Sequence, residues 1–395
     1  MNRQTASYRP ETITVHSRGA ADLSGAGNPV IPADVRSTVF FHPEPGLSAE
    51  YQYTRNENPN RDRLETTIAS LEQGSDCAVF ASGMAAVAAV FGCLPPESTV
   101  VIPDDVYHGT RTFLTRFAER LRLNVHTIDM EAKSRNGQDS IADSLARVAR
   151  TTGSVDLVWV ETPSNPLLKI SDISFLAKQA HSFGALLCVD NTWASPMNQQ
   201  PFALGADLIV HSATKYLGGH SDILAGAVVG NGDGAVFERI RDTQRMAGSV
   251  LSAHDCWMLT RSIKTLALRM HAHNSNASML APMLLSHPKV KTVYYPGLPG
   301  HPGHEVARAQ MTGYGGMISF ELATSEQAAR QFVHETQLIA AATSLGGVES
   351  TWEHRRSVEG PASSTPPTLI RLSVGIEHID DLAADITQAL RTLPA

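Results

Sequence analysis

The chain has 395 residues, of which 42% are hydrophobic and 18% are charged, and its formal net charge at pH 7 is -7. This composition is that of a globular protein and not of a disordered one. The negative charge argues against a nucleic-acid or anionic-membrane surface, and no apolar run reaches the roughly 18 residues that span a bilayer. Residues 1–10 are polar and contain no signal-peptide core. These features indicate a cytoplasmic metabolic enzyme with no nucleic-acid or membrane partner.

The cysteines and histidines give no sign of a metal centre. The four cysteines form no C-x-x-C pair and stand far apart, as Cys77, Cys93, Cys188 and Cys256. Most lie in apolar surroundings, where a reduced core thiol is the commoner state. His271 and His273 flank one alanine, but no other ligand cluster stands at zinc spacing, so no metal is expected.

The first two regions along the chain are an arm and an α/β domain. The length exceeds that of one ordinary hydrophobic core, so two domains are expected. Residues 1–55 are rich in Pro and Gly and are expected to form an extended N-terminal arm. Residues 56–250 alternate strand and helix signals. The predicted strands are 76–81, 99–102, 124–128, 155–160, 185–190 and 207–211, and the predicted helices include 82–93 and 173–183. The last three strands lack polar alternation, which is typical of a parallel sheet covered on both faces.

Residues 251–395 are expected to form a smaller C-terminal α/β domain. A long helix over 261–285 leads into it, and the other predicted elements are strands 291–295, 316–322 and 369–374 and helices 325–335 and 379–393. The Pro-rich stretch 361–367 is interpreted as a surface loop, with a lid at the edge of a cleft as the alternative.

The segment from Asp207 to His220 carries the strongest chemical signal. An apolar strand runs into Ser212, Thr214 and Lys215, followed by a glycine pair. A protonated lysine is a poor nucleophile, so a lysine that forms an imine must lie where its ammonium form is disfavoured. The layout suits a lysine joined to an aldehyde cofactor, with both hydroxyls placed to bind a phosphate. The alternative for a lone lysine is a surface position.

A carboxylate stands at the end of the preceding predicted strand, which is where open parallel sheets bind ligands. Asp190 there can pair with a protonated pyridine nitrogen and make the ring a better electron sink. Asp190 and Thr192 would also serve as a helix cap or turn. Because Lys215 follows the next strand, we favour the cofactor interpretation and assign Thr192 to the same site.

Two further segments fit a cofactor that carries a phosphate and an aromatic ring. Gly83 and Met84 begin a helix directly after a strand, where free N–H groups and the helix dipole bind phosphate. Tyr107 can lie flat against a pyridine ring, although a lone aromatic residue is more often part of a core. Tyr53 and Arg55 stand two apart on an extended segment, so both can point at one phosphate, the arginine in bidentate fashion.

These motifs, in this order from about residue 35 to the end, resemble the Cys/Met-metabolism family of pyridoxal-phosphate (PLP) enzymes, which includes cystathionine lyases and synthases and methionine γ-lyase. The resemblance implies PLP as cofactor and fold type I, the aspartate-aminotransferase-like α/β fold. It implies that Tyr53 and Arg55 reach the cofactor phosphate of a neighbouring subunit, in a dimer of dimers. It further implies that Asn165, Ser344 and Arg371 bind the substrate, with the Arg371 fork on its α-carboxylate.

Several positions depart from the family pattern and bear on the reaction. The cysteine typical of methionine γ-lyases is absent from the stretch around Tyr107, and His108 stands where Gly is commoner. Thr343 and Thr112 replace the Glu and Arg that many cystathionine γ-lyases use at the far end of cystathionine. The region from Ser344 to Arg371 still resembles bacterial cystathionine γ-lyases most.

The resemblance therefore implies a carbon–sulfur lyase that catalyses γ-elimination on a sulfur amino acid, with L-cystathionine as the preferred substrate. Lys215 is the predicted general base at Cα, Asp190 the partner of the ring, and Tyr107 a helper in proton transfer. The alternatives are γ-replacement, as in cystathionine γ-synthase or a homoserine-ester sulfhydrylase, then methionine γ-lyase or a β-lyase. A PLP-binding scaffold without catalysis is disfavoured because Lys215, Asp190, Tyr107 and Arg371 are all present.

Overall fold

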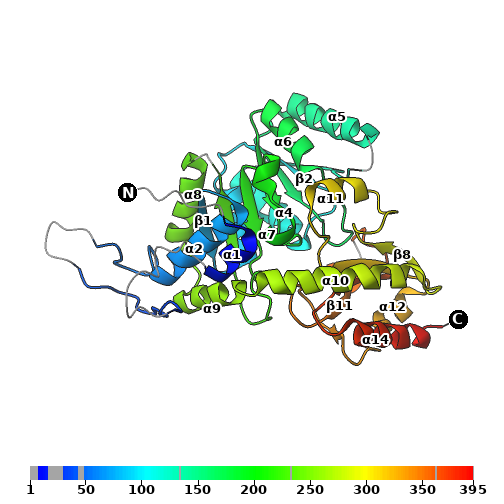
Figure 1. Cartoon of the computed structure of the whole chain (residues 1–395). Coiled ribbons are helices and arrows are strands. Elements are labelled where there is room, and N and C mark those ends of the chain that lie inside the picture. Colours follow the sequence, from blue (N-terminus) through cyan, green and yellow to red (C-terminus); the bar gives the residue numbers. More distant parts are fainter. Residues whose placement is uncertain are drawn as a thin grey trace.

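The computed structural model describes residues 8–16, 30–42, 49–132, 135–231, 234–360 and 363–394, without the side chains of 135–139. Two β-sheets, each covered by helices, make up the body of the protein, and the long helix α10 (Leu266–Leu285) runs past both (Figure 1). The described part of the N-terminal region, 30–42 and 49–55, projects from the larger sheet's side of the molecule. No helix in these ranges is long and apolar enough to cross a membrane.

The larger sheet has seven strands in the order β1-β7-β6-β5-β4-β2-β3. β7 runs antiparallel to both of its neighbours, and the remaining pairings are parallel. The strands are β1 (Asp76–Phe80), β2 (Thr99–Pro103), β3 (Asn124–Ile128), β4 (Leu157–Glu161), β5 (Leu186–Asp190), β6 (Leu208–His211) and β7 (Gly226–Gly230). Short connections and helices bring the carboxyl ends of β4, β5 and β6 to one edge, where a parallel sheet offers its ligand site.

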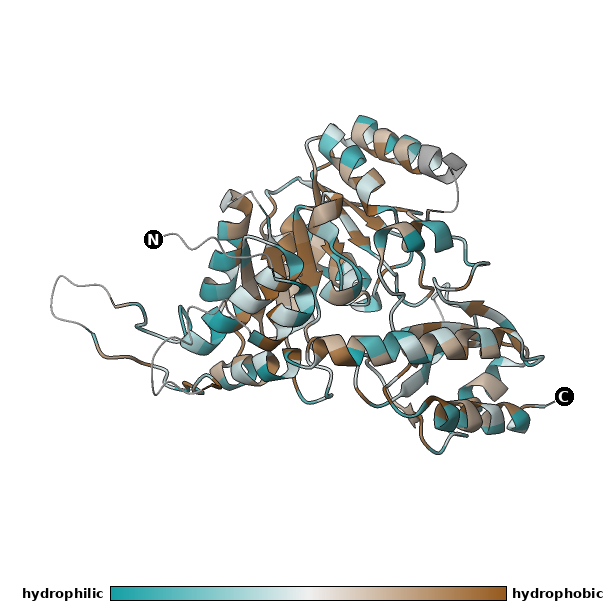
Figure 2. Cartoon of the chain, viewed as in Figure 1, coloured by the Kyte–Doolittle hydropathy of each residue, from teal (hydrophilic) through white to brown (hydrophobic). Residues whose placement is uncertain are grey.

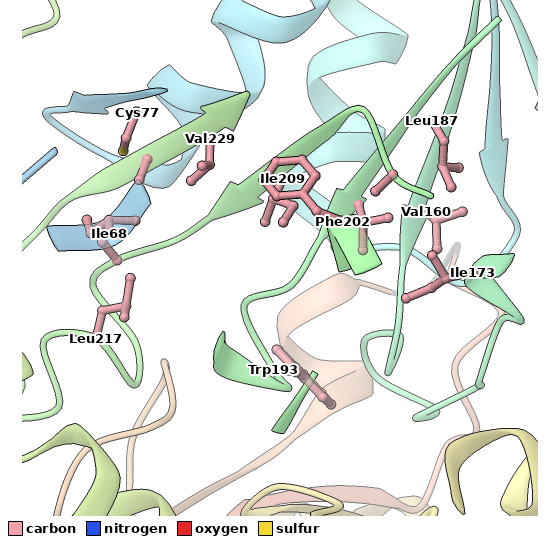
Figure 3. Packing of buried hydrophobic residues seen from close by; sticks show 14 of the residues in the cluster. Ile68, Cys77, Val160, Ile173, Leu187, Trp193, Phe202, Ile209, Leu217 and Val229 are labelled. Atoms are coloured by element: carbon pink, nitrogen blue, oxygen red, sulfur yellow. The ribbon is translucent and has the colours of Figure 1, made fainter. Parts of the chain in front are cut away.

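Alternate residues of these strands enter two separate apolar layers. One layer packs on α2 (Pro59–Glu72), α5 (Arg135–Thr152), α6 (Ile173–Ser182) and α9 (Ala253–Ile263). Figure 3 shows Val160, Leu187 and Ile209 of adjacent strands in this layer, with Ile173 of α6 close by. The other layer packs on α3 (Gly83–Gly92), α4 (His108–Leu121) and α8 (Gly234–Met246). Burial on both faces explains why the central strands are hydrophobic throughout (Figure 2).

The smaller sheet has five strands in the order β10-β11-β12-β9-β8. They are β8 (Val290–Tyr294), β9 (Met317–Leu322), β10 (Ala340–Ala341), β11 (Thr351–His354) and β12 (Leu369–Ser373). Their apolar side packs on α10, α12 (Glu326–Phe332) and α14 (Ile379–Thr392). Four short α-helices and one 3₁₀ helix complete the described elements: α1 (Pro10–His16), α7 (Ser195–Asn198), α11 (His304–Gln310), α13 (Arg355–Glu359) and η2 (Pro201–Leu204).

The fold class and the predicted strands agree with this structure, and two predictions differ. Residues 10–16 of the expected irregular arm form the helix α1, with Thr14 buried. The single helix predicted over 261–285 is wrong, because α9 ends at Ile263 and α10 begins at Leu266. Thr265 between them has φ -107 and ψ 6, which is not helical. The helical spacing of apolar residues therefore continues in the sequence although the helix itself is interrupted. The domain boundaries at 55 and 250 stay predictions.

Candidate active site

The candidate active site lies at the carboxyl ends of β4, β5 and β6, against β12 of the smaller sheet. Glu161 ends β4 and lies opposite Asp190, which ends β5. His211 ends β6 and is followed by Ser212 and, three residues on, by Lys215. The register of the parallel strands therefore brings side chains from three separate sequence motifs to one edge.

Lys215 is held beside a loop of the smaller domain. Its Nζ donates to Oγ of Ser344 at 2.5 Å. Burial, and secondarily the charge of Arg371, lower the pKa of Lys215 to about 8. Ser344 has φ +82, a left-handed conformation that costs a non-glycine residue about 1–3 kcal/mol and is concentrated at functional sites. A lysine with a lowered pKa is a nucleophile and base near neutrality, as the sequence interpretation requires.

The turn that carries Lys215 is fixed from behind by Arg269 of α10. Its Nη1 donates to the carbonyl of Tyr216 at 2.6 Å, and its Nη2 donates to the carbonyl of Ser262 at 3.0 Å. Gly219 has φ +69, and a Cβ there would lie 2.1 Å from Nη1 of Arg269. The second glycine of the motif is thus needed both for its backbone conformation and for the close approach of this guanidinium. Arg269 was not found from the sequence.

Asp190, Thr192 and Ser212 are joined in one network. The Asp190 carboxylate accepts from the Thr192 N–H at 3.0 Å, and the Thr192 hydroxyl accepts from the Ser212 N–H at 2.8 Å. Burial raises the pKa of Asp190, and the hydrogen bonds from Thr192 counteract part of that effect. Asp190 therefore makes the local turn that the sequence offered as an alternative. A carboxylate in a turn can still bind a cation with its second oxygen, so the two interpretations are compatible.

Gly83, Met84 and Tyr107 gather next to Ser212. A Cβ on Gly83 would lie 2.9 Å from Oγ of Ser212, so only glycine lets the start of α3 approach this closely. A Cβ on Gly109 would lie 2.4 Å from Cε1 of Tyr107 and 3.0 Å from Sδ of Met84. The N-terminus of the ten-residue helix α3 thus lies next to the predicted phosphate-binding hydroxyl of Ser212. The dipole of the helix favours a negatively charged phosphate at this place.

Two buried carboxylates that the sequence analysis missed hold the loops of the site. Glu161 accepts from the Tyr107 N–H at 2.8 Å, and burial together with the Asp190 charge raises its pKa well above the usual range. Asp105 accepts from the Ser164 hydroxyl and from the Leu167 N–H at 3.0 Å. Each acid stands a few residues before a residue predicted to belong to the site: Asp105 before Tyr107, and Glu161 before Asn165. Their role depends on contacts between distant loops, which local sequence patterns do not reveal.

Arg371 stands on β12, facing the larger sheet. Its Nη1 donates to Oδ1 of Asn165 at 3.1 Å, and its Nη2 donates to the carbonyl of Ser344 at 3.0 Å and to Glu353. Its guanidinium carbon lies 5.8 Å from the ring centroid of Trp193, in cation–π geometry. The structure thus brings together the three residues predicted to bind the substrate. Glu353 and Trp193 were not found from the sequence.

Thr214 has a structural partner of its own. Its hydroxyl accepts from the Ala225 N–H at 2.9 Å and lies 3.2 Å from the Ala225 carbonyl. Behind the site, the fully buried side chains of His211 and Glu72 lie 2.5 Å apart, and the His211 charge lowers the pKa of Asp190 in part. Asn191 also donates to Glu72, at 2.9 Å. This pair supports the floor of the site from the protein interior.

Tyr53 and Arg55 lie on the exposed arm, apart from this cluster. The Arg55 guanidinium carbon lies 5.5 Å from the Tyr53 ring centroid, and Nη1 of Arg55 donates to the carbonyl of Arg245 at 2.9 Å. Tyr53 remains 40% exposed. Within one chain, the structure pairs these two residues with each other and not with Ser212 or Gly83. Their predicted contact with a neighbouring subunit's cofactor stays a prediction.

The three positions that depart from the family pattern lie at the rim. His108 and Thr343 are exposed, and Thr112 is half-buried with its hydroxyl 3.2 Å from Nε2 of His108. Arg111 donates to the carbonyl of Asp104, which turns its guanidinium toward its own loop. Of the predicted loop or lid at 361–367, residues 361 and 362 lie outside the described residues. Ser363 and Thr365 both donate to Oε2 of Glu359 at 2.6 Å.

The site as built fits a phosphorylated pyridine aldehyde. Lys215 has an amine of lowered pKa, Asp190 offers a carboxylate at the next strand end, and the space at Gly83 beside Ser212 is one that a Cβ would close. An amine for the aldehyde, an acid for the ring nitrogen and a helix N-terminus for the phosphate define a PLP-dependent enzyme.

Comparison with known proteins agrees with this class. The family of Cys/Met metabolism PLP-dependent enzymes matches residues 11–391. The chain is 42% identical over 397 residues to cystathionine γ-lyase of Dictyostelium discoideum, covering 98% of this chain and 99% of the relative. It is also 42% identical over 388 residues to cystathionine γ-synthase of Mycobacterium tuberculosis, covering 96% of each. The crystal structure of cystathionine γ-synthase from Xanthomonas oryzae pv. oryzae with cystathionine superposes with a TM-score of 0.89 at 37% identity, covering 97% of this chain and 98% of that one.

The chain therefore belongs to the Cys/Met-metabolism family of PLP-dependent enzymes. The family assignment, the PLP cofactor and the fold expected from the sequence are confirmed. Because lyases and synthases match to the same degree, overall similarity does not separate elimination from replacement.

Proposed function

We propose that this enzyme catalyses γ-elimination on a sulfur amino acid, with L-cystathionine as the best substrate. Cystathionine and water would give cysteine, 2-oxobutyrate and ammonia. The observation that carries the proposal is the placement of Lys215 between two groups. Its Nζ lies at Ser344, whose carbonyl accepts from Arg371, while Asp190 ends β5, the neighbour of the strand β6 that leads to Lys215. A base for Cα thus stands beside a fork for the α-carboxylate.

Each residue has a role that follows from its contacts. Arg371 and Asn165 bind and orient the α-carboxylate, since the guanidinium fork matches that group. Lys215 Nζ takes the proton from Cα, because its pKa, lowered to about 8, leaves a much larger neutral fraction at pH 7 than an ordinary lysine has. Tyr107, whose N–H is held by Glu161, assists the proton transfers that accompany loss of the thiolate from Cγ.

PLP, when bound, supplies an electron sink for the negative charge that develops at Cα. Gly83, Met84, Thr192, Ser212 and Thr214 would hold it on the side of the phosphate, and Asp190 at the ring nitrogen. We further propose that Tyr53 and Arg55 complete the phosphate site of a partner subunit, which would explain why both stay exposed on an arm.

The second candidate is γ-replacement, as in cystathionine γ-synthase. The observation that favours it is the rim, where Thr343 and Thr112 carry no charge for the far end of cystathionine and Arg111 is turned toward Asp104. Replacement uses the same base and the same carboxylate fork. Only the fate of the unsaturated intermediate differs.

The test is a substrate panel on the purified holoenzyme. Cystathionine, homocysteine, methionine and O-acylhomoserine with or without cysteine are incubated separately, and 2-oxo acid, thiol and cystathionine are measured. Our proposal expects 2-oxobutyrate and cysteine from cystathionine at the highest kcat/KM. Faster formation of cystathionine from O-acylhomoserine and cysteine would overturn it in favour of the synthase.

A further inference from the structure

Arg371 is the first member of a network of four buried charged side chains. Arg371 and Arg355 both donate to Oε1 of Glu353, Arg355 at 2.5 Å. Nη2 of Arg355 donates to Oε1 of Glu359 at 2.8 Å. Each of these side chains is at most 8% exposed. This network of charged side chains ends at the loop after α13, where the hydroxyls of Ser363 and Thr365 both donate to Glu359.

Local structure explains why these charges meet. Glu353 on β11 lies opposite Arg371 on β12 in the antiparallel register. α13 begins directly after β11, so Arg355 and Glu359 stand four apart on one helical face. β11 and α13 therefore deliver three of the four groups, and β12 delivers the fourth.

Such a network is an expensive way to build a core. Burying an ion carries a desolvation penalty of several kcal/mol, and well-packed apolar residues in its place are often as stable or more stable. The two arginines and two glutamates balance to zero net charge. A single carboxylate, Glu353, screens two guanidinium groups that would otherwise repel each other.

We propose that Arg355 is a positioning residue for the substrate's α-carboxylate, acting through Glu353 on Arg371. Sharing one carboxylate oxygen with Arg355 keeps Glu353 from neutralising Arg371 on its own. The guanidinium of Arg371 is thus only partly compensated and keeps a positive field toward Asn165 and Ser344, where the substrate carboxylate is proposed to bind. This inference rests on the carboxylate-binding role of Arg371 in the proposed function.

The directions in which the pKa values of Arg371 and Lys215 are shifted agree with this geometry. Burial, and then the charge of Arg355, lower the pKa of Arg371 to about 10, and the charges of Glu353 and Glu359 offset part of that effect. Burial lowers the pKa of Lys215 most, the charge of Arg371 lowers it further, and the charge of Glu353 raises it in part. A bound carboxylate at Arg371 would relieve both cations.

The test uses three variants of the holoenzyme. Arg355→Met removes the second cation, so Glu353 pairs with Arg371 alone and the site gains one negative charge. Glu359→Gln removes the far anion and leaves the Arg355 to Glu353 contact in place. The double variant Arg355→Met/Glu359→Gln removes one charge of each sign, which preserves neutrality and guards against loss of folding. Arg308→Gln, which breaks an exposed pair with Glu305, is the surface control.

Binding of propionate, a carboxylate without an amine, is measured by calorimetry and needs no turnover. We expect its dissociation constant, and KM for the amino-acid substrate, to rise roughly tenfold in Arg355→Met, a size typical of coupling within one ion network. The double variant should weaken propionate binding in the same direction. Glu359→Gln should leave affinity unchanged or improve it, and kcat should change less than KM in all three.

Two outcomes would overturn the proposal. One is unchanged propionate affinity in both Arg355 variants, even with lowered thermal stability. The other is a loss in Glu359→Gln as large as that in Arg355→Met. Reaction with propylamine, which lacks a carboxylate, should be the same in wild type and variants. If the wild type bound propionate but turned over no sulfur amino acid, the proposed reaction would fail while this inference stood.

Discussion

The floor and the rim of the site are built in opposite ways. At the floor, Asp190, Lys215 and Arg371 are surrounded by protein. Lys215 and Arg371 each have a partner from a distant segment of the chain, and Asp190 is bonded to Thr192 in its own turn. At the rim, His108 and Thr343 are exposed and no ion pair holds either side chain among the described residues. In the proposed function, the floor carries the chemistry that lyases and synthases would share, and the rim faces the far end of the substrate. The proposal therefore implies that chemistry and choice of reaction can be altered separately.

The largest effect should come from removing the base at the floor. Lys215→Ala should lower turnover by at least about a thousandfold, since general acid–base catalysis alone contributes 10²–10⁴-fold. Near-visible absorption from the lysine-bound cofactor should also disappear, while circular dichroism stays that of the wild type. Turnover at the wild-type rate would place the reactive amine elsewhere.

Attachment of PLP to the apoenzyme should depend on pH through the same amine. The pKa of Lys215 is lowered to about 8, so the amine is mostly protonated below that pH and mostly neutral above it. The rate of covalent attachment, followed by borohydride reduction and mass spectrometry, should rise through pH 8 and level off above about pH 9. A rise that continues to pH 10 would mean that burial does not lower this pKa.

Asp190→Asn tests whether charge or turn geometry matters at β5. Asparagine keeps an oxygen for the Thr192 N–H but loses the charge for the ring nitrogen. We expect retention of PLP to weaken by about 2–5 kcal/mol, as for other buried charge pairs that lose one partner. Asp172→Asn, at the cap of α6, is the matched control and should leave retention unchanged. Normal cofactor binding in Asp190→Asn would reduce Asp190 to a turn residue.

The arm can be tested by mixing inactive subunits. Arg55→Ala and Lys215→Ala should each lose most activity as homodimers. If Arg55 serves the partner's cofactor, a mixed dimer holds one intact site, and random mixing should restore about a quarter of the sites. Activity recovery is measured after co-refolding at several ratios. No recovery at any ratio would show that Arg55 acts within its own chain.

Part of the floor could be predicted from the sequence, because two of its residues stand at or soon after the end of an apolar strand. Asp190 ends β5 and Lys215 lies four residues after the end of β6, and parallel strands place such residues at one edge. What could not be predicted arises between segments. Glu161, Glu353 and Arg269 act through contacts across strands and helices that no local period encodes. The break between α9 and α10 was missed because the buried apolar residues on either side of it, Ile263 and Leu266, keep the spacing of one helix.

The measurement that tests the separation of floor and rim most directly is the kcat/KM of Thr343→Glu on two substrates. Cystathionine carries a charged far end, whereas methionine does not. An exposed ion pair contributes about 1 kcal/mol at most, so we predict a rise of about fivefold or less on cystathionine and no change on methionine. The near-visible spectrum should stay that of the wild type. Equal changes on both substrates, or an altered spectrum, would contradict the account, because the rim would then act on the shared chemistry.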